Sequence, residues 1–226
     1  MKKLIIFGNG KIAEAVYNSM LEDDDFKYEI ECFCVEKKFK KKNSFLKLPN
    51  HNFETIEKKF NPSKYLFFVA VGYQELNEFR EKTIRNVKRK GYKTISFIHK
   101  SHKKNQSLKI GNNCFLMKGS VIHPNVIIED NVFVWGGSVI CHHSIIKKNS
   151  WITAGSKIMG SCIVGSNTFI AGGSLISHNI KLGSRCFIGA NTLVNKSLKK
   201  DAVVIKKPDD RLRIKSKQFI KMFNFN

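Results

Sequence analysis

The chain has 226 residues, 42% of them hydrophobic and 11% aromatic, which is enough apolar material for the core of one large domain or two small ones. Its 40 Lys and Arg against 18 Asp and Glu give a net charge of +22, and without a recognition motif this charge does not predict nucleic-acid binding. No stretch approaches the ~20 apolar residues of a membrane span, and six Cys without a C-x-x-C pair are too sparse for a disulfide scaffold. We therefore expect a folded, cytoplasmic protein.

The first strand and helix are joined by a glycine-rich segment. A buried strand over residues 3–7 is followed by Gly8-Asn9-Gly10-Lys11-Ile12-Ala13 and a helix over residues 13–20, and a second strand over residues 28–35 ends at Glu36. This G-x-G-x-x-A pattern, with an acid after the second strand, is typical of Rossmann-like domains, where the helix N-terminus binds phosphate. Gly8, Gly10, Lys11 and Glu36 are the candidate nucleotide-binding residues.

A third strand over residues 65–71 leads to Gly72, which joins these candidates. A helix through residues 80–90 and a last strand near residues 94–98 complete the alternation. We therefore predict a Rossmann-like α/β domain over residues 1–105, which is within the usual size range of a domain.

From Ile110 the sequence has a period of six. Fifteen successive positions at this spacing, from Ile110 to Val194, are all aliphatic, and the residue four further on is small or β-branched from Cys114 to Thr192, with Leu198 last. This period predicts a parallel β-helix of hexapeptides over residues 106–205, with three hexads in each 18-residue coil and five coils in all. The corner residues Cys114, Cys162 and Cys186 are then small buried side chains and not catalytic thiols.

Hexapeptide repeats of this consensus resemble the left-handed β-helix acyltransferases, which transfer acyl groups from coenzyme A or acyl carrier protein. With a Rossmann-like domain in front, the chain resembles the sugar acyltransferases of bacterial surface-glycan synthesis, of the sialic acid O-acetyltransferase and nucleotide-amino-sugar N-acetyltransferase type. The most specific segment is residues 134–146, VWGGSVICHHSII. The resemblance implies acetyl-CoA as co-substrate, a nucleotide-linked amino sugar as acceptor, a homotrimer, and His142 as the general base.

Two residues depart from the pattern of that family. Many relatives place an acid directly after the catalytic His, where this chain has His143, and relatives acting on 4-amino sugars have a second His nine residues on, where it has Trp151. A His cannot supply a carboxylate's charge, so His143 is kept as a candidate catalytic residue of unassigned role. The departures leave open which sugar and nucleotide are used, whether an amine or a hydroxyl is acylated, and whether the acyl group is acetyl.

The repeat itself predicts what lies beside His142. Residues 18 apart are stacked, so Gly160 lies one coil above His142, where a thioester carbonyl could approach the backbone closely. Acyl transfer needs a donor for the oxyanion, commonly a backbone N–H, and we assign this role to Gly160. His123 and His178 either line the same cleft or belong to the surface.

The resemblance also implies that the cofactor lies in a groove between neighbouring β-helices, along small residues. The candidates are Gly155, Gly160, Ala171, Gly172, Gly173, Gly189 and Ala190. Turns between hexads favour Gly in any case, which is the alternative explanation for several of them. Residues 206–226 are predicted to form a short basic C-terminal helix that caps the repeat or docks on a neighbour. A peripheral contact with an anionic membrane is the alternative role for this helix.

Three alternatives remain from the sequence. An O-acetyltransferase of a sugar hydroxyl, of the sialic acid type, differs only in the acceptor. A zinc enzyme on the same fold would need a third ligand beside His142 and His178, and none stands at the next coil near Gly183, so no metal is expected. A non-catalytic scaffold would instead use the G-x-G-x-x-A segment to bind NAD.

Overall fold

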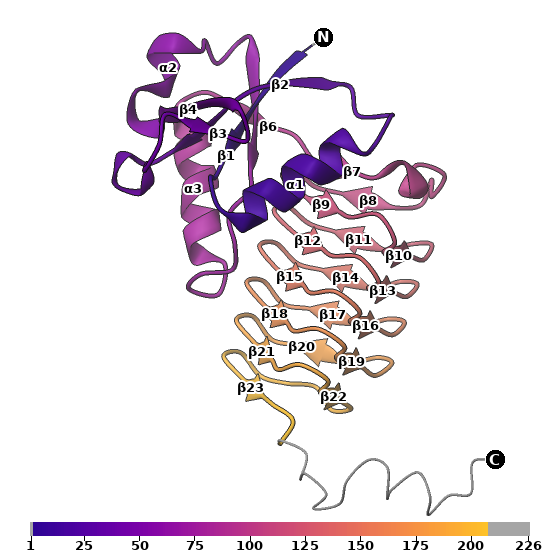
Figure 1. The fold of residues 1–226 in the computed structure, drawn as a ribbon. Coiled ribbons are helices and arrows are strands. Elements are labelled where there is room, and N and C mark those ends of the chain that lie inside the picture. The colour runs from indigo at the N-terminus through magenta and orange to yellow at the C-terminus, as the bar shows by residue number, and fades with distance from the viewer. Residues whose placement is uncertain (1, 208–226) are drawn as a thin grey trace, which may run out of the picture.

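The computed structural model describes residues 2–207, as a sheet-and-helix domain beside a stack of short strands (Figure 1). The domain has a six-stranded sheet in the order β3-β4-β2-β1-β5-β6, parallel except for β3. Its elements are β1 (Lys2–Phe7), α1 (Lys11–Leu21), β2 (Tyr28–Val35), η1 (Lys37–Phe39), β3 (Ser44–Phe45), β4 (Leu48–Asn52), η2 (Phe53–Thr55), α2 (Ile56–Lys59), β5 (Tyr65–Val69), α3 (Glu78–Arg89) and β6 (Lys93–Thr94).

Alternation along β1 divides the domain core between the two faces of the sheet. Leu4 and Ile6 pack with α1 against the β-helix, whereas Ile5 and Phe7 pack with α3 and η2 on the other face. All four side chains are buried. The strands and helices predicted near residues 3–7, 13–20, 28–35, 65–71 and 80–90 are present.

The strand predicted near residues 94–98 is two strands in different sheets. β6 pairs with β5, whereas β7 (Phe97–Ile98) pairs with β9 of the β-helix. Between them, the Ser96 hydroxyl donates to the Gly111 carbonyl and accepts from the Cys114 N–H. The stack of strands therefore starts at β7, before the 18-residue repeat of the sequence becomes visible.

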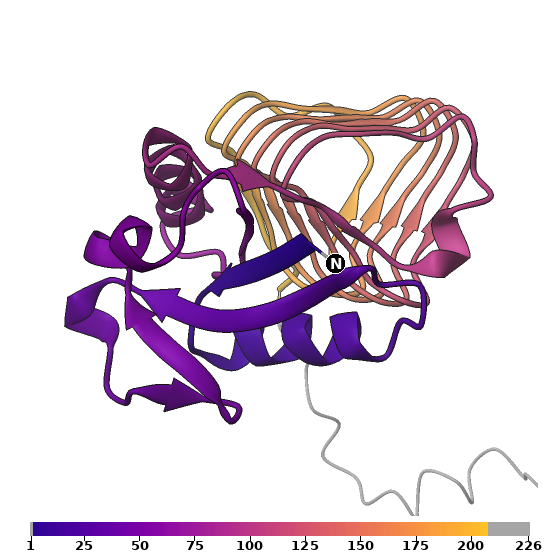
Figure 2. The same cartoon turned by 90° about the horizontal axis from the view of Figure 1, so that it is seen from above.

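The β-helix consists of three parallel sheets that form a tube of triangular cross-section (Figure 2). Each strand pairs with the strand 18 residues away, as in Ile128 with Ile146 and Val134 with Ile152. A short 3-10 helix, η3 (Lys100–His102), precedes the remaining strands. These strands are β8 (Lys109–Ile110), β9 (Phe115–Leu116), β10 (Val121–Ile122), β11 (Ile127–Ile128), β12 (Phe133–Val134), β13 (Val139–Ile140), β14 (Ile145–Ile146), β15 (Trp151–Ile152), β16 (Lys157–Ile158), β17 (Ile163–Val164), β18 (Phe169–Ile170), β19 (Leu175–Ile176), β20 (Lys181–Leu182), β21 (Phe187–Ile188), β22 (Leu193–Val194) and β23 (Val203–Val204). Five complete coils, β8 to β22, confirm the predicted period.

The small corner residues are buried and hydrogen-bonded between coils. The Ser144 and Ser150 hydroxyls donate to the carbonyls of Met159 and Gly165, each 15 residues further on, and the Cys162 thiol does the same to Ser177. A hydroxyl or thiol thus satisfies a corner carbonyl that has no strand partner. Burial also raises the pKa of the Cys162 thiol, in keeping with its predicted structural role.

The last turn is shorter than the repeat. Phe187 pairs with Val203, and Leu198 bridges Leu182, a residue that points to the axis from a strand. Leu198 therefore lies on a face and not at the corner position that the hexad count gave it. The C-terminal helix predicted at residues 206–226 lies, from residue 208 on, outside the described residues. Among the described residues, none belongs to a helix long and apolar enough to cross a bilayer.

One outer face of the β-helix is covered by the N-terminal domain. An aromatic column, defined as the residues Phe97, Phe115, Phe133, Trp151, Phe169 and Phe187, runs along the sheet at a spacing of 18 and packs against α1 and the sheet of that domain. Trp151 stacks on Phe133 with ring centroids 5.0 Å apart and is 2% exposed. Trp151 is therefore part of the domain interface.

A buried arginine of α3 fastens the same interface. Arg80 is fully buried and donates to the side chain and carbonyl of Asn131, to the Asn149 carbonyl, to the Asn77 side chain and to the Gly72 carbonyl. Burial lowers its pKa to about 9, so the guanidinium remains charged at neutral pH. The charge is met by carbonyl dipoles and by the ring of Phe133, 4.6 Å away.

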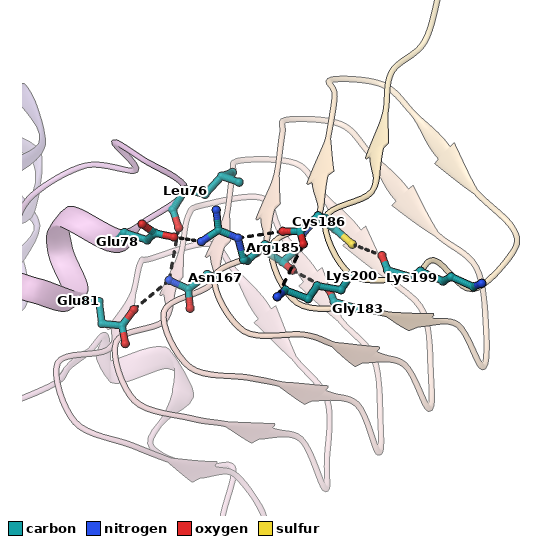
Figure 3. Close-up of polar contacts among 11 residues, drawn as sticks. Leu76, Glu78, Glu81, Asn167, Gly183, Arg185, Cys186, Lys199 and Lys200 are labelled. Carbon is teal, nitrogen blue, oxygen red and sulfur yellow. Dashed lines mark hydrogen bonds and ion pairs between the residues drawn. The ribbon is translucent and has the colours of Figure 1, made fainter.

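Polar contacts at the start of α3 extend the interface toward the C-terminal coils (Figure 3). Arg185 pairs with Glu78 of α3 and, at 2.9 Å, with Asp201 of the last turn. The Asn167 amide donates to Glu81 at 3.1 Å. The N-terminal domain is thus held along most of the length of one face.

Candidate active site

His142 and His143 lie in an exposed turn between β13 and β14. Their Nδ1 atoms are 3.1 Å apart, and the His143 Nε2 is 3.3 Å from the Asn125 amide one coil below. His143 has a φ of 60°, and the residues at the same turn position in neighbouring coils, Asn125, Ser161 and Asn179, share this left-handed conformation. Position 143 is therefore shaped by the turn, and its ring is held against that of His142.

Gly160 lies directly over the His142 ring, as the repeat predicted. A Cβ at Gly160 would be 2.7 Å from His142 Cε1, 2.9 Å from His142 Nε2 and 3.1 Å from His178 Nδ1, so any side chain there would displace the His142 ring. Within the described part of the chain, the Gly160 N–H meets no hydrogen-bond acceptor, whereas the neighbouring Ser161 N–H donates to the His142 carbonyl. The turn thus places an imidazole beside a free backbone donor, as acyl transfer requires.

The other candidate cofactor residues lie at a different corner of the tube. Gly155, Ala171, Gly172, Gly173, Gly189 and Ala190 all follow strands of the sheet that carries the aromatic column, whereas Gly160 belongs to the His142 corner. The structure therefore does not bring this set together with His142 inside one protomer. Gly155 and Gly173 have φ values of 72° and 70°, so the turn itself accounts for glycine at these two positions.

His123 and His178 belong to the same corner as His142. His178 lies above Gly160 with its ring centroid 6.2 Å from that of His142, and His123 is half-buried one coil below Cys141. Over residues 2–207, no three His, Cys, Asp or Glu side chains are grouped so that they could hold a metal ion.

A pocket of about 880 Å³ opens where β1 and β5 end, at the edge of the N-terminal sheet. Gly8, Gly10, Lys11 and Gly72 all line it, so the structure brings these four predicted residues together. Gly8 has a φ of 134° and a Cβ there would be 2.5 Å from the Ala70 carbonyl, so glycine is required. Glu36 does not line the pocket; its carboxylate pairs with Lys38 at 2.9 Å.

Helix α1 begins at this pocket with an uncapped N-terminus. No side chain caps Gly10, and lysines from the segment after β2 line the opposite wall: Lys38, Lys41 and Lys42. A helix N-terminus with nearby lysines attracts phosphate groups. Two aromatic rings, Phe39 and Phe45, offer apolar surface beside these charges.

Sequence reasoning missed Asn50 and the segment around it. Asn50 in β4 lines the pocket and is 3% exposed, and its amide donates to the Lys42 carbonyl while Oδ1 has no hydrogen-bond partner. Residues 37–59 have no clear period of two or 3.6, so no strand or helix is predicted there. The five lysines among residues 37–42 were the only signal in the sequence for this segment.

The pocket and His142 are on opposite sides of the protomer. The N-terminal domain packs on the sheet of the aromatic column, and the His142 turn joins the other two sheets, at the corner opposite that face (Figure 2). A single protomer therefore presents two half-sites that do not meet.

Comparisons with known proteins agree with this architecture. Residues 107–142 and 143–178 match the family model described as bacterial transferase hexapeptide (six repeats). No curated protein matches the sequence significantly. The acetyltransferase domain of PglB from Neisseria gonorrhoeae, in complex with acetyl coenzyme A, is 19% identical over 93% of this chain and 99% of its own, with a TM-score of 0.76.

A second set of similar structures comes from Caulobacter crescentus. PerB in complex with CoA and GDP-perosamine is 19% identical over 90% of this chain and 94% of its own, with a TM-score of 0.76. A histidine-to-alanine variant of GDP-perosamine N-acetyltransferase from the same organism, in complex with the same two molecules, gives 19% identity over 92% and 97% and a TM-score of 0.78. The chain therefore carries the bacterial transferase hexapeptide repeat and has the fold of these sugar acetyltransferases, a Rossmann-like domain followed by a left-handed β-helix.

Proposed function

We propose that the protein is an acetyl-CoA-dependent acetyltransferase that acylates a nucleotide-linked amino sugar in bacterial surface-glycan synthesis. The observation that carries this proposal is the free Gly160 N–H directly over the His142 imidazole. The similar structures were obtained with acetyl coenzyme A, with CoA and with GDP-perosamine, which supports the same classes of ligand here.

The chemistry follows from the two groups at this corner. The sugar amine attacks the thioester carbon while His142 Nε2 accepts the amine proton, and the Gly160 N–H donates to the oxygen that becomes negative. Collapse of the tetrahedral intermediate breaks the carbon–sulfur bond, and the His142 imidazolium returns the proton to the leaving thiolate. The products are the N-acetyl sugar and free CoA. His178, on the other side of Gly160, is near enough to contact the same ligand.

The proposal requires a neighbouring protomer, because the two half-sites of one chain do not meet. We propose a homotrimer, in which the N-terminal pocket of one protomer holds the nucleotide and presents the sugar to His142 of the next. The nucleotide diphosphate would bind at Gly10 and Lys11 with the facing lysines, and coenzyme A would lie along the small residues of the adjoining corner. The positive charge of the chain suits both phosphate-bearing ligands.

Thiol release from acetyl-CoA with UDP-, GDP- and dTDP-linked amino sugars tests the proposal. We expect turnover with at least one acceptor, and a loss of roughly 10²- to 10⁴-fold in kcat for His142→Ala with an unchanged melting temperature. His51→Ala, a histidine outside both half-sites, is the control and should retain full activity. Unchanged turnover in His142→Ala would exclude His142 as the base.

The thiol-release assay and a thermal-shift measurement together separate the alternatives. Thiol release with a sugar hydroxyl and not with any amino sugar would favour O-acetylation. Thermal stabilisation by NAD, without stabilisation by acetyl-CoA or a nucleotide sugar, would favour a dinucleotide-binding scaffold. A cytoplasmic location belongs to the proposal as well, since both substrates are made there.

A further inference from the structure

His142, His143 and Asn125 form a continuous chain of polar contacts at the candidate site. The His142 Nδ1 faces the His143 Nδ1 at 3.1 Å, and the His143 Nε2 faces the Asn125 Nδ2 at 3.3 Å. The remaining nitrogen, His142 Nε2, lies beneath Gly160. Only one ring nitrogen of the two histidines is thus left to face a ligand.

The positions of the protons along this series of contacts decide whether His142 can act as a base. A neutral imidazole carries one N–H, so a contact between two Nδ1 atoms needs one donor and one acceptor. If His143 Nδ1 donates, His142 must carry its own proton on Nε2, and Nε2 has no lone pair for a substrate proton. If His142 Nδ1 donates, His142 Nε2 is free to accept, and His143 then carries its proton on Nε2.

The Asn125 amide selects between these two arrangements. Its Nδ2 can only donate to His143 Nε2, which enforces the incompetent arrangement, whereas its Oδ1 can only accept from a His143 Nε2–H, which enforces the competent one. The structure places the Asn125 Nδ2 toward His143 Nε2. Because the nitrogen and oxygen of an amide are nearly identical in shape, a half-turn of the side chain brings Oδ1 to the same position.

We propose that Asn125 and His143 are positioning residues that fix the tautomer of His142, with Asn125 Oδ1 accepting from His143 Nε2–H and His143 Nδ1 accepting from His142 Nδ1–H. This inference rests on the proposed role of His142 as general base. It gives His143 the task of an orienting acceptor without a negative charge. The arrangement also places a lone pair at His142 Nε2 beside the Gly160 donor, so that the site offers one acceptor and one donor to the reacting groups.

A spectroscopic test needs no activity. Long-range ¹⁵N–¹H spectra of the full chain labelled in its 7 histidines report which nitrogen of each neutral ring is protonated, and His142→Asn and His143→Asn variants assign the two signals. We expect His142 to carry its proton mainly on Nδ1 and His143 on Nε2. The reverse assignment would overturn the inference, even if the wild-type protein proves to be an acetyltransferase.

Two substitutions of Asn125 give a second readout. Asn125→Asp offers only acceptors, so it should keep at least the wild-type kcat and the same tautomers. Asn125→Gly keeps the φ of 59° but removes the amide, so kcat should fall roughly three- to tenfold, the size of one lost hydrogen bond, without a change in KM for acetyl-CoA. If Asn125→Asp lost as much activity as Asn125→Gly, the amide N–H would be the required group and the inference would be wrong.

Asn179 supplies the matched control. It occupies the same turn position three coils further on, with a φ of 61°, and among the described residues its side chain makes no hydrogen bond to a histidine. Its backbone N–H donates to the Gly160 carbonyl, and both control substitutions keep that N–H. Asn179→Asp makes the same charge change and Asn179→Gly the same backbone change. Both should leave kcat and the His142 signal as in the wild type.

Discussion

Gly160 shows how a single missing Cβ allows a reactive geometry. Its Cα lies between His142 and His178, and any side chain would occupy the space of the His142 ring. Other hexad turns use glycine for a positive φ, but no positive φ is found at Gly160, so close approach alone explains this residue. The two neighbouring imidazoles, and not the backbone conformation, therefore require glycine at position 160.

Gly160→Ala should therefore abolish activity with little loss of stability. The added methyl group displaces the exposed His142 ring and blocks the backbone N–H, so we expect kcat to fall at least 10²-fold, the size of a lost oxyanion donor. The melting temperature should change by no more than a few degrees, because the displaced atoms are the ends of exposed side chains. Full activity of this variant would argue against the oxyanion role of Gly160.

Among the elements, α3 is the one whose surroundings differ most from those that its sequence suggests. Its charged residues suggest an exposed helix, yet Arg80 is buried against the β-helix, whereas Arg85 keeps 66% of its side chain exposed. Spacing alone does not tell which arginine of a helix meets the neighbouring domain. Two of the carbonyls that accept from Arg80, those of Asn131 and Asn149, belong to corners of the β-helix, which no local pattern reveals.

Arg80→Met should destabilise the protein by about 2–4 kcal/mol, because it leaves the buried carbonyls of Gly72, Asn131 and Asn149 without donors. Arg85→Met is the control on the same helix. It removes only an exposed pair with Glu81 at 4.0 Å and should cost less than about 1 kcal/mol. Equal losses of unfolding free energy in urea would show that Arg80 does not fasten the domains.

The elements that the sequence predicted are those with a regular period. The hexads from Ile110 to Val194 gave the 18-residue register, and that register alone placed Gly160 over His142. The same count, applied to outward-facing residues, would have found the aromatic column from Phe97 to Phe187 and with it the face that the N-terminal domain covers. Asn50 and the strands around it could not be found this way, because their positions depend on pairing with β2 and not on a local pattern.

At the scale of the whole molecule, the separation of the two half-sites leads to a complementation test. Gly10→Asp adds a carboxylate at the phosphate site while providing a favourable helix cap, and no atom lies within 4 Å of the added Cβ. Co-expressed with His142→Ala, it should restore about a quarter of the wild-type rate, because a site that combines two chains is intact in one random pairing of four. No restoration would mean that each protomer works with its own pocket and its own His142.

The aromatic column also limits how such a chain can change in length. Each ring of the column belongs to one coil and packs against the N-terminal domain. Insertions or deletions in the β-helix therefore keep the rings aligned only if they comprise complete 18-residue coils. A coil inserted before residue 142 would shift the imidazole along the β-helix axis by one strand spacing, ~4.8 Å, relative to the pocket of the adjacent protomer. A coil inserted after residue 194 would lengthen the β-helix without shifting the imidazole. We therefore expect additional coils to be tolerated best at the C-terminal end of the β-helix.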